Sequence, residues 1–135
     1  MEDYPEEYLL LATIPAAPWI EMSSQMPEGP FNPDDLPDEI KAMNQVKFDV
    51  MDELTASGEL IASGGLEDPT RTTTVVNADG SIDRREGNPG DGDTLVCYMI
   101  VRCSRERAVE VAARVAAVTG ERYEVRPTRG VYLAP

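Results

Sequence analysis

Short apolar runs recur along the chain and predict a protein rich in β-strands. The strongest run, residues 94–103 (TLVCYMIVRC), is long and rich in β-branched side chains, which is typical of a central strand. A second run at residues 8–14 predicts a buried strand that opens the fold. Shorter runs at residues 59–66, 70–76 and 122–127 predict three more strands.

Two segments show helical spacing instead. In residues 38–57 the side chains that recur at helical intervals are Ile40, Met43, Lys47, Val50, Met51 and Leu54. Gly58 follows this segment, in the position where glycine commonly ends a helix. Residues 105–119 carry a similar stripe, with Ser104 as N-cap and Gly120 as the stop. The predicted apolar side of this segment consists of Val109, Ala112, Ala113 and Ala116. The sequence therefore predicts two amphipathic helices.

The order of these elements predicts the fold class. Asn-Ala-Asp-Gly at residues 77–80 predicts a hairpin turn, after which residues 81–86 pair back briefly. The whole series gives a ferredoxin-like α+β fold, in which an antiparallel sheet carries both helices on one face. Strands this apolar also need a cover on the other face. A second copy of the sheet supplies that cover most simply, so we expect a homodimer.

A proline-rich segment at residues 15–37 interrupts this pattern within a single predicted domain, residues 1–135. It holds six prolines, which predict that it forms neither a regular helix nor an interior strand. Trp19, Met22, Met26 and Phe31 make it apolar enough to fold back over the rest of the chain. A lid-like insertion over a binding site and a simple cover for the edge of the core both fit.

Charge and composition restrict the partners. The net charge is −13, and residues 1–68 hold 16 acids but only two lysines. An acidic surface repels phosphate backbones, so we expect no nucleic acid partner, whereas a basic protein partner or a role in solubility both fit. No apolar run reaches the roughly 20 residues of a membrane helix, and an N-terminus that begins with acids is unlike a secretory signal.

The two cysteines and the missing histidines restrict the chemistry. Cys97 and Cys103 lie about 20 Å apart if one strand holds both, which is too far for a disulfide, so we expect reduced thiols in a cytoplasmic protein. The chain has no histidine. This excludes Ser-His-Asp and Cys-His nucleophiles and makes a zinc site improbable. We therefore expect no metal and no cofactor, with acid–base chemistry from carboxylates, tyrosine, cysteine or lysine.

The order and spacing of several motifs resemble the YCII-related, or DGPF-domain, family over roughly residues 8–127. The resemblance rests on YLLLATI at residues 8–14, on the cadence of residues 51–80 (MDELTASGELIASGGLEDPTRTTTVVNADG) and on EVRP at residues 124–127. The family's Asp-Gly-Pro-Phe motif corresponds here to Glu-Gly-Asn-Pro at residues 86–89. The acid and glycine are kept, and the Pro-Phe pair is lost.

The resemblance implies a dimeric α+β barrel in which the loop carrying Glu86 borders a cleft in each subunit. Proteins of similar fold include muconolactone isomerases, dehalogenating lyases and small cyclases, and some family members are encoded near sigma factors. Better-studied relatives use a histidine–aspartate pair in the cleft, and that mechanism cannot be transferred to a chain without histidine.

Several residues are candidates for the site. Glu86 is the candidate general base, and Tyr98 is the candidate donor to a substrate carbonyl. The predicted substrate-binding residues are Trp19, Met22, Arg71, Thr73 and Arg126, where an arginine would hold a carboxylate. Each also has a simpler interpretation: an exposed loop acid, a core tyrosine, surface ion pairs or cover for the core.

Two functions fit these observations. The first is a cofactor-independent isomerase, cyclase, dehydratase or lyase that acts on a small metabolite, in keeping with bacterial secondary metabolism. It would use a carboxylate as base, with tyrosine or arginine stabilising negative charge. The alternative is a non-catalytic protein that binds a ligand, or an acidic accessory protein that docks on a basic partner such as a sigma factor.

Overall fold

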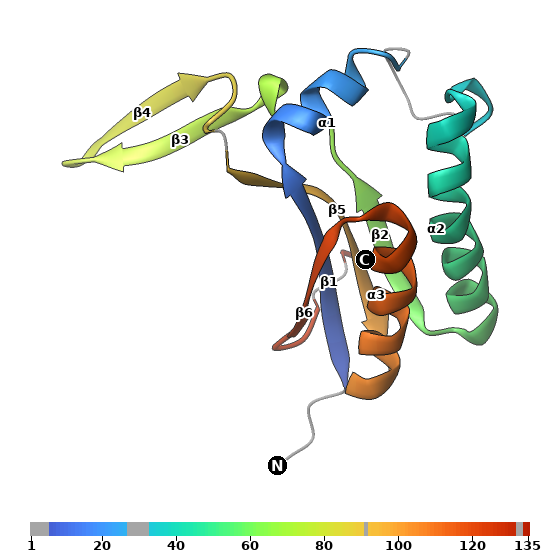
Figure 1. Ribbon diagram of the computed structural model, residues 1–135. Helices are drawn as coiled ribbons and strands as arrows, with labels where there is room; N and C mark the ends of the chain where they lie inside the picture. The colour runs from blue at the N-terminus through green and yellow to red at the C-terminus, as the bar shows by residue number, and fades with distance from the viewer. Residues whose placement is uncertain (1–5, 27–32, 91, 132–133) are drawn as a thin grey trace.

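The computed structural model describes residues 6–26, 33–90, 92–131 and 134–135, which form an α+β fold with a four-stranded antiparallel sheet. The strands lie in the order β2 (Leu60–Gly65), β5 (Asp93–Arg102), β1 (Glu7–Pro15) and β6 (Arg122–Pro127). The long helices α2 (Asp38–Ser57) and α3 (Arg105–Thr119) cover the same face of this sheet (Figure 1). The predicted ferredoxin-like arrangement is therefore confirmed.

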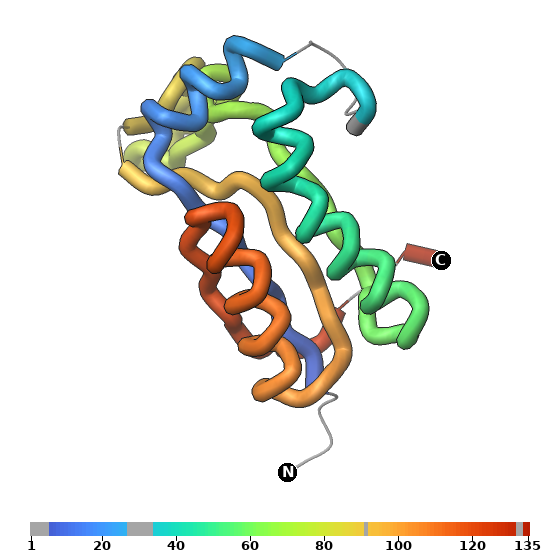
Figure 2. Tube along the Cα trace, turned by 45° about the vertical axis from the view of Figure 1, so that its right-hand side comes forward, coloured from blue at the N-terminus to red at the C-terminus, as the bar shows by residue number. Residues whose placement is uncertain are grey.

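The core lies between the sheet and the two long helices. Leu10 of β1 is paired with Met99 of β5, and both side chains are buried on the helix side of the sheet. The fully buried side chains of the helices that meet them include Val50, Leu54 and Val111. Figure 2 shows the two helices side by side across the strands. Burial of these apolar side chains is the main source of the fold's stability.

The helix ends follow the sequence signals closely. Helix α2 ends at Gly58, which has a φ of 80°, and α3 ends at Gly120, which has a φ of 73°. These left-handed conformations suit glycine, which has no β-carbon to clash with the backbone. At the start of α3 the Ser104 hydroxyl accepts a hydrogen bond from the Arg107 amide at 3.1 Å. Both predicted helices are confirmed with these caps. The apolar side predicted for α3 is wrong except at Ala112, because the buried side chains are Ala108, Val111, Ala112 and Val115, whereas Val109 is 47% exposed.

The prediction that the proline-rich segment holds no regular helix is wrong for its first part. Helix α1 spans Ala16–Ser23 and includes Pro18. Pro18 lies in the first turn, where a backbone N–H has no partner within the helix, so its loss costs little. The Ala16 amide donates to the Gly92 carbonyl at 3.1 Å, and the Ser23 hydroxyl donates to Asp68 at 2.8 Å. The body of the protein thus holds both ends of α1.

The rest of this segment is described only in part. Residues 33–35 form the short 3₁₀ helix η1 (Pro33–Asp35), and Leu36 after it is buried. Phe31, which was predicted to join the apolar cover, lies outside the described residues. None of the described helices combines the length and apolarity that a membrane crossing requires.

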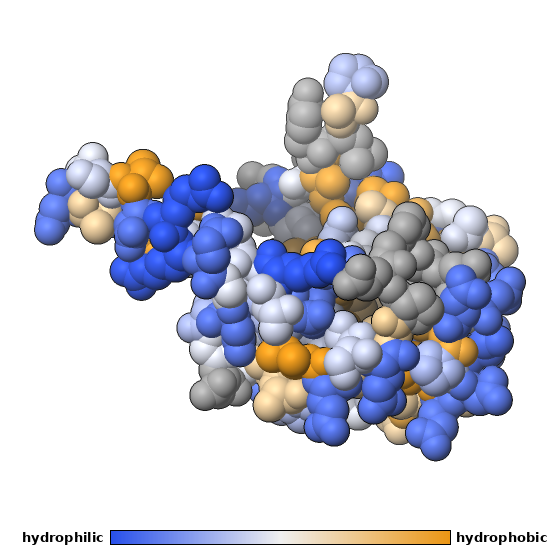
Figure 3. All heavy atoms as spheres, turned by 90° about the horizontal axis from the view of Figure 1, so that it is seen from above, coloured by the Kyte–Doolittle hydropathy of each residue, from blue (hydrophilic) through white to orange (hydrophobic). Residues whose placement is uncertain are grey.

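A separate hairpin projects from the body between β2 and β5 (Figure 1). It consists of β3 (Thr73–Ala78) and β4 (Ser81–Glu86), joined by the predicted turn. The predicted strand at residues 70–76 begins only at Thr73, because Pro69–Arg71 forms the 3₁₀ helix η2. The hairpin carries exposed apolar side chains among hydrophilic ones (Figure 3), with Val75 60% and Ile82 66% exposed.

Candidate functional site

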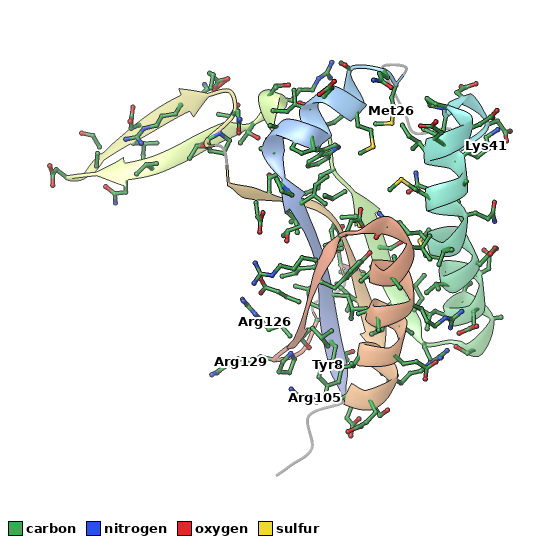
Figure 4. All side chains as sticks on the ribbon, in the orientation of Figure 1. Tyr8, Met26, Lys41, Arg105, Arg126 and Arg129 are labelled. Carbon is green, nitrogen blue, oxygen red and sulfur yellow. The ribbon has the colours of Figure 1, made fainter. Side chains whose placement is uncertain are left out.

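A cavity of about 630 Å³ lies between the first half of α2, strands β2 and β5, and the start of β6. Helix α1 covers its upper end, where Trp19, Met22 and Met26 line it. Figure 4 shows Met26 and other sulfur-bearing side chains between α1 and α2. The volume falls within the range of sites for small molecules, about 300–1,000 Å³.

A partly buried cluster of four polar groups lines this cavity: Lys47, Cys97, Glu121 and Tyr123. The Lys47 ammonium donates to Glu121 Oε2 at 2.7 Å, and the Tyr123 hydroxyl donates to Glu121 Oε1 at 3.3 Å. The Cys97 sulfur lies 3.7 Å from Lys47 Nζ and 4.0 Å from the Tyr123 oxygen. The Glu121 carboxylate therefore accepts hydrogen bonds at both of its oxygens.

The chain near Gly120 places the acid of this cluster. Gly120 ends α3 and turns the chain, so that Glu121 comes directly before β6. The Thr119 hydroxyl accepts from the Glu121 amide at 3.2 Å and donates to the Val115 carbonyl at 3.0 Å, which anchors this turn to the helix. Tyr123 follows two residues after Glu121 and points to the same side of the sheet, as alternation along a strand requires.

Burial keeps two members of the cluster protonated. Burial raises the pKa of Tyr123, and the nearby Cys97 and Glu121 groups raise it further. Burial also raises the pKa of the Cys97 thiol, although the Lys47 charge opposes this shift. At neutral pH Tyr123 is therefore a hydrogen-bond donor and Cys97 a neutral thiol. Lys47 and Glu121 form an ion pair whose side chains are mostly buried.

Three of the residues predicted from the sequence line this cavity: Trp19, Met22 and Tyr98. Trp19 is only 4% exposed, so it covers the core as well as the cavity. Tyr98 lies across Gly64 of the neighbouring strand, and a β-carbon at Gly64 would come within 2.6 Å of the tyrosine hydroxyl. Tyr98 points away from the side of β5 that carries Cys97 and Met99, so it borders the cavity at the β2 edge.

Glu86 was predicted to lie at the mouth of a cleft, but it does not line this cavity in the single chain. It ends β4 on the projecting hairpin, where its side chain is 66% exposed. It accepts a hydrogen bond from Thr73 at 3.1 Å and pairs with Arg84 at 3.5 Å. The reason for the difference is that the hairpin leaves the sheet rather than lying along it. In the described chain, Glu86 and Thr73 therefore form a surface pair.

The two predicted arginines also lie elsewhere. Arg126 extends from β6 on the side away from α3 and pairs with Glu124 at 3.2 Å (Figure 4). Arg71 lies in η2 rather than in a strand. It lines a second cavity of about 270 Å³, together with Asp68 and Thr94. The structure thus does not bring Glu86, Thr73, Arg71 and Arg126 into the larger cavity.

Lys47 and Glu121 were not predicted as site residues, although the sequence carries a signal for each. Lys47 stands in the apolar stripe of the helix at residues 38–57, where a charge needs a partner. Glu121 directly follows the glycine that ends the second helix. Only the pairing of α2 with the start of β6 shows that these two residues meet.

Within the described ranges, no group of three or more histidine, cysteine, aspartate or glutamate side chains could hold a metal ion. Comparison with protein-family models gives no match for this chain, and no curated protein matches it either. The candidate site is therefore defined by its geometry.

Proposed function

We propose that the protein is a cofactor-independent enzyme that moves a proton next to a carbonyl group of a small metabolite. One observation carries this proposal: among the described residues that line the cavity, the mostly buried carboxylate of Glu121 lies beside two hydrogen-bond donors, Lys47 and Tyr123. A base next to donors for a developing negative oxygen is the arrangement that proton abstraction from carbon requires.

In the proposed step, Glu121 takes a proton from the carbon next to the carbonyl. The electron pair of the broken C–H bond forms a C=C bond, and the carbonyl π electrons move to the oxygen to give an enolate. Lys47 and Tyr123 donate hydrogen bonds to that oxygen. Glu121 then returns the proton to a different carbon, which completes an isomerisation. If the enolate instead expels a leaving group or closes a ring, the same residues catalyse elimination or cyclisation.

The resting geometry supports these roles. An ammonium group has three N–H bonds, and the contacts of Lys47 with Glu121 and Cys97 use two directions. The high pKa of Tyr123 keeps its hydroxyl protonated, as a donor to an enolate must be. Its single O–H points to Glu121 at 3.3 Å in the resting site and turns to the substrate oxygen in the proposed step. The apolar walls strengthen these hydrogen bonds, because charges interact more strongly where water is excluded.

Deuterium exchange tests this proposal without knowledge of the natural substrate. We would incubate the protein with 2-tetralone, a neutral ketone with acidic neighbouring C–H bonds, in D₂O and follow loss of those protons by NMR. We expect Glu121→Gln to lower the protein-catalysed rate at least about 100-fold, the range for loss of a general base. Glu106→Gln, an exposed acid in the first turn of α3 that lies outside the cavity and outside the proposed dimer face, is the matched control. Exchange no faster than in buffer contradicts the proposal, and binding without exchange identifies a ligand carrier.

We also propose that the protein is a homodimer that pairs through the outer face of the sheet, as the resemblance to YCII-related proteins implies. The apolar side chains Leu9, Leu11, Tyr98 and Ile100 alternate with the core residues and are only partly buried in one chain. The projecting hairpin adds further exposed apolar surface, and an isolated two-stranded hairpin is marginally stable without a cover.

Light scattering after size-exclusion chromatography tests the dimer. We expect twice the 14.8 kDa of one chain, and a monomer for Leu11→Arg, because the new charge would be buried between the sheets. Val109→Arg, on the exposed side of α3, is the control and should remain dimeric. A wild-type mass of 14.8 kDa would contradict the proposal.

A further inference from the structure

The described residues that line the large cavity carry more negative than positive charge. Three of them are acids, the mostly buried Glu121 and the exposed Asp35 and Glu67, and Lys47 is the single cation among them. That cation already contacts Glu121 at 2.7 Å, so its charge is compensated inside the protein. A ligand with a carboxylate or phosphate would therefore enter a net negative site without an uncompensated cation to receive it.

The apolar part of the lining has an unusual composition. The chain holds six methionines, and every one after the first residue lines this cavity: Met22, Met26, Met43, Met51 and Met99. They come from α1, the loop after it, α2 and β5, so they surround the space from several sides. Methionine is flexible and polarisable, and it contacts aromatic rings favourably. Such walls adapt to an apolar body, and the aromatic side chains of Trp19 and Phe48 add flat surfaces.

We infer that the ligand of this cavity is an uncharged, mainly apolar compound with a carbonyl group, and that the lining selects it over carboxylic acids of the same shape. Its apolar body lies among the methionines between α1 and α2. Its carbonyl oxygen lies at Lys47 and Tyr123, a placement that rests on the proposed function. The selection against acids comes from the charge of the lining and does not depend on catalysis.

The chain contains a built-in probe for this inference. Trp19 is its single tryptophan and lines the cavity, so a bound naphthyl ring quenches its emission. Two probes with the same ring system differ only in the group that matters: 2-acetonaphthone is a neutral ketone, and 2-naphthoate is a carboxylate. We expect 2-acetonaphthone to quench Trp19 with a dissociation constant at least about 10-fold lower than that of 2-naphthoate, which corresponds to about 1.4 kcal/mol.

A charge-neutral variant sharpens the test. In Asp35→Asn/Glu67→Gln two lining acids lose their charge while the side chains keep their shapes. We expect the preference for the ketone to fall at least about 3-fold, mainly through tighter binding of 2-naphthoate. Asp49→Asn/Asp52→Asn, on the exposed side of α2, makes the same change in net charge outside the cavity and should leave the preference unchanged.

The outcomes separate this inference from the proposed function. If 2-naphthoate binds as tightly as 2-acetonaphthone, or if neither quenches Trp19, the inference is overturned, whatever the deuterium exchange of 2-tetralone shows. If the ketone is preferred but Glu121→Gln does not slow exchange, the ligand class stands and the proton-transfer mechanism fails. Equal loss of preference in the control variant would assign the effect to overall charge and overturn selection by the lining.

Discussion

The two halves of helix α2 lie over the same sheet but form very different surroundings. In the second half Val50 and Leu54 are fully buried against the sheet and α3. In the first half Ile40, Met43 and Lys47 are only partly buried and line the cavity. The same helical stripe therefore contributes a packed core at one end and a binding space at the other.

The difference comes from what lies beside the helix. The ion pairs that join α3 to α2 meet the second half, where Glu53 contacts Arg107 at 2.7 Å and Arg114 at 2.9 Å. Figures 1 and 2 show that α2 extends past the end of α3. Beyond that end, α1 lies across the cavity from α2. The first half of α2 therefore borders an open space instead of a packed helix. The side chains there are long and flexible, whereas those of the packed half are compact and branched.

The largest expected effect is a difference in the free energy of unfolding between variants of the two halves of α2. Leu54→Ala removes a fully buried side chain and should lower the free energy of unfolding by about 2–5 kcal/mol. Met43→Ala, at the cavity, should cost about 1 kcal/mol or less, because its surroundings are already open. Urea unfolding followed by circular dichroism measures both. Similar losses would mean that the first half of α2 is packed as tightly as the second.

The second effect concerns the ion pair between Lys47, in the first half of α2, and Glu121. Lys47→Met leaves the mostly buried Glu121 without its cationic partner and should lower the free energy of unfolding by about 1–3 kcal/mol. Lys47→Met/Glu121→Gln should recover part of this loss, because no unpaired charge remains. Lys41→Met, a change of the chain's other lysine near the start of α2, is the control. A double variant less stable than Lys47→Met would contradict this account.

A smaller effect is expected at the β2 edge of the cavity. Gly64→Ala would place a β-carbon within 2.6 Å of Tyr98, so the ring must move, at a cost of about 1 kcal/mol. The adjacent Gly65→Ala meets no atom within 4 Å and should be close to neutral. Thermal unfolding of the two variants measures the difference. Equal melting temperatures would show that Tyr98 does not depend on a glycine opposite it.

The smallest effect is a dependence on pH. Because burial raises the pKa of Tyr123, the folded protein keeps its phenol proton at a pH where the unfolded chain, with a pKa of about 10, has lost it. This contribution is complete below about pH 10 and is lost as pH rises above that value, by up to about 1 kcal/mol at pH 10.5. Urea unfolding between pH 8 and 10.5 should show a shallower decline for Tyr123→Phe. An unchanged slope would mean that Tyr123 ionises equally in both states.

The sequence predicted the elements well where a local signal decides them. A following glycine marked the end of both long helices, the apolar period located α2, and Asn77 with Gly80 marked the hairpin turn. In α3 the many small apolar residues left the buried side ambiguous, and the side predicted from the sequence was wrong except at Ala112. The prediction failed at α1, because it relied on the number of prolines and did not consider where in a helix each proline would lie. Pro18 is tolerated in a first turn, and a count of prolines does not contain that information.

The candidate site was predictable only in part. Trp19, Met22 and Tyr98 were predicted correctly as lining residues. Trp19 and Met22 belong to an apolar segment that covers the core, and Tyr98 belongs to the central strand, so the sequence indicates that all three lie near the interior. The position of Glu86 was predicted from the order of motifs along the chain. That order does not specify the direction in which the hairpin leaves the sheet, so it could not predict where Glu86 lies.

The sequence by itself determined the main strands and the two long helices, and therefore the ferredoxin-like order, because period, caps and turns act over a few residues. Only the tertiary structure decided that Lys47 meets Glu121, 74 residues further along the chain, in the lining of a cavity. That meeting depends on how far α2 extends past α3 and on where the chain turns at Gly120. Such distances result from the packing of whole elements, which no local pattern records.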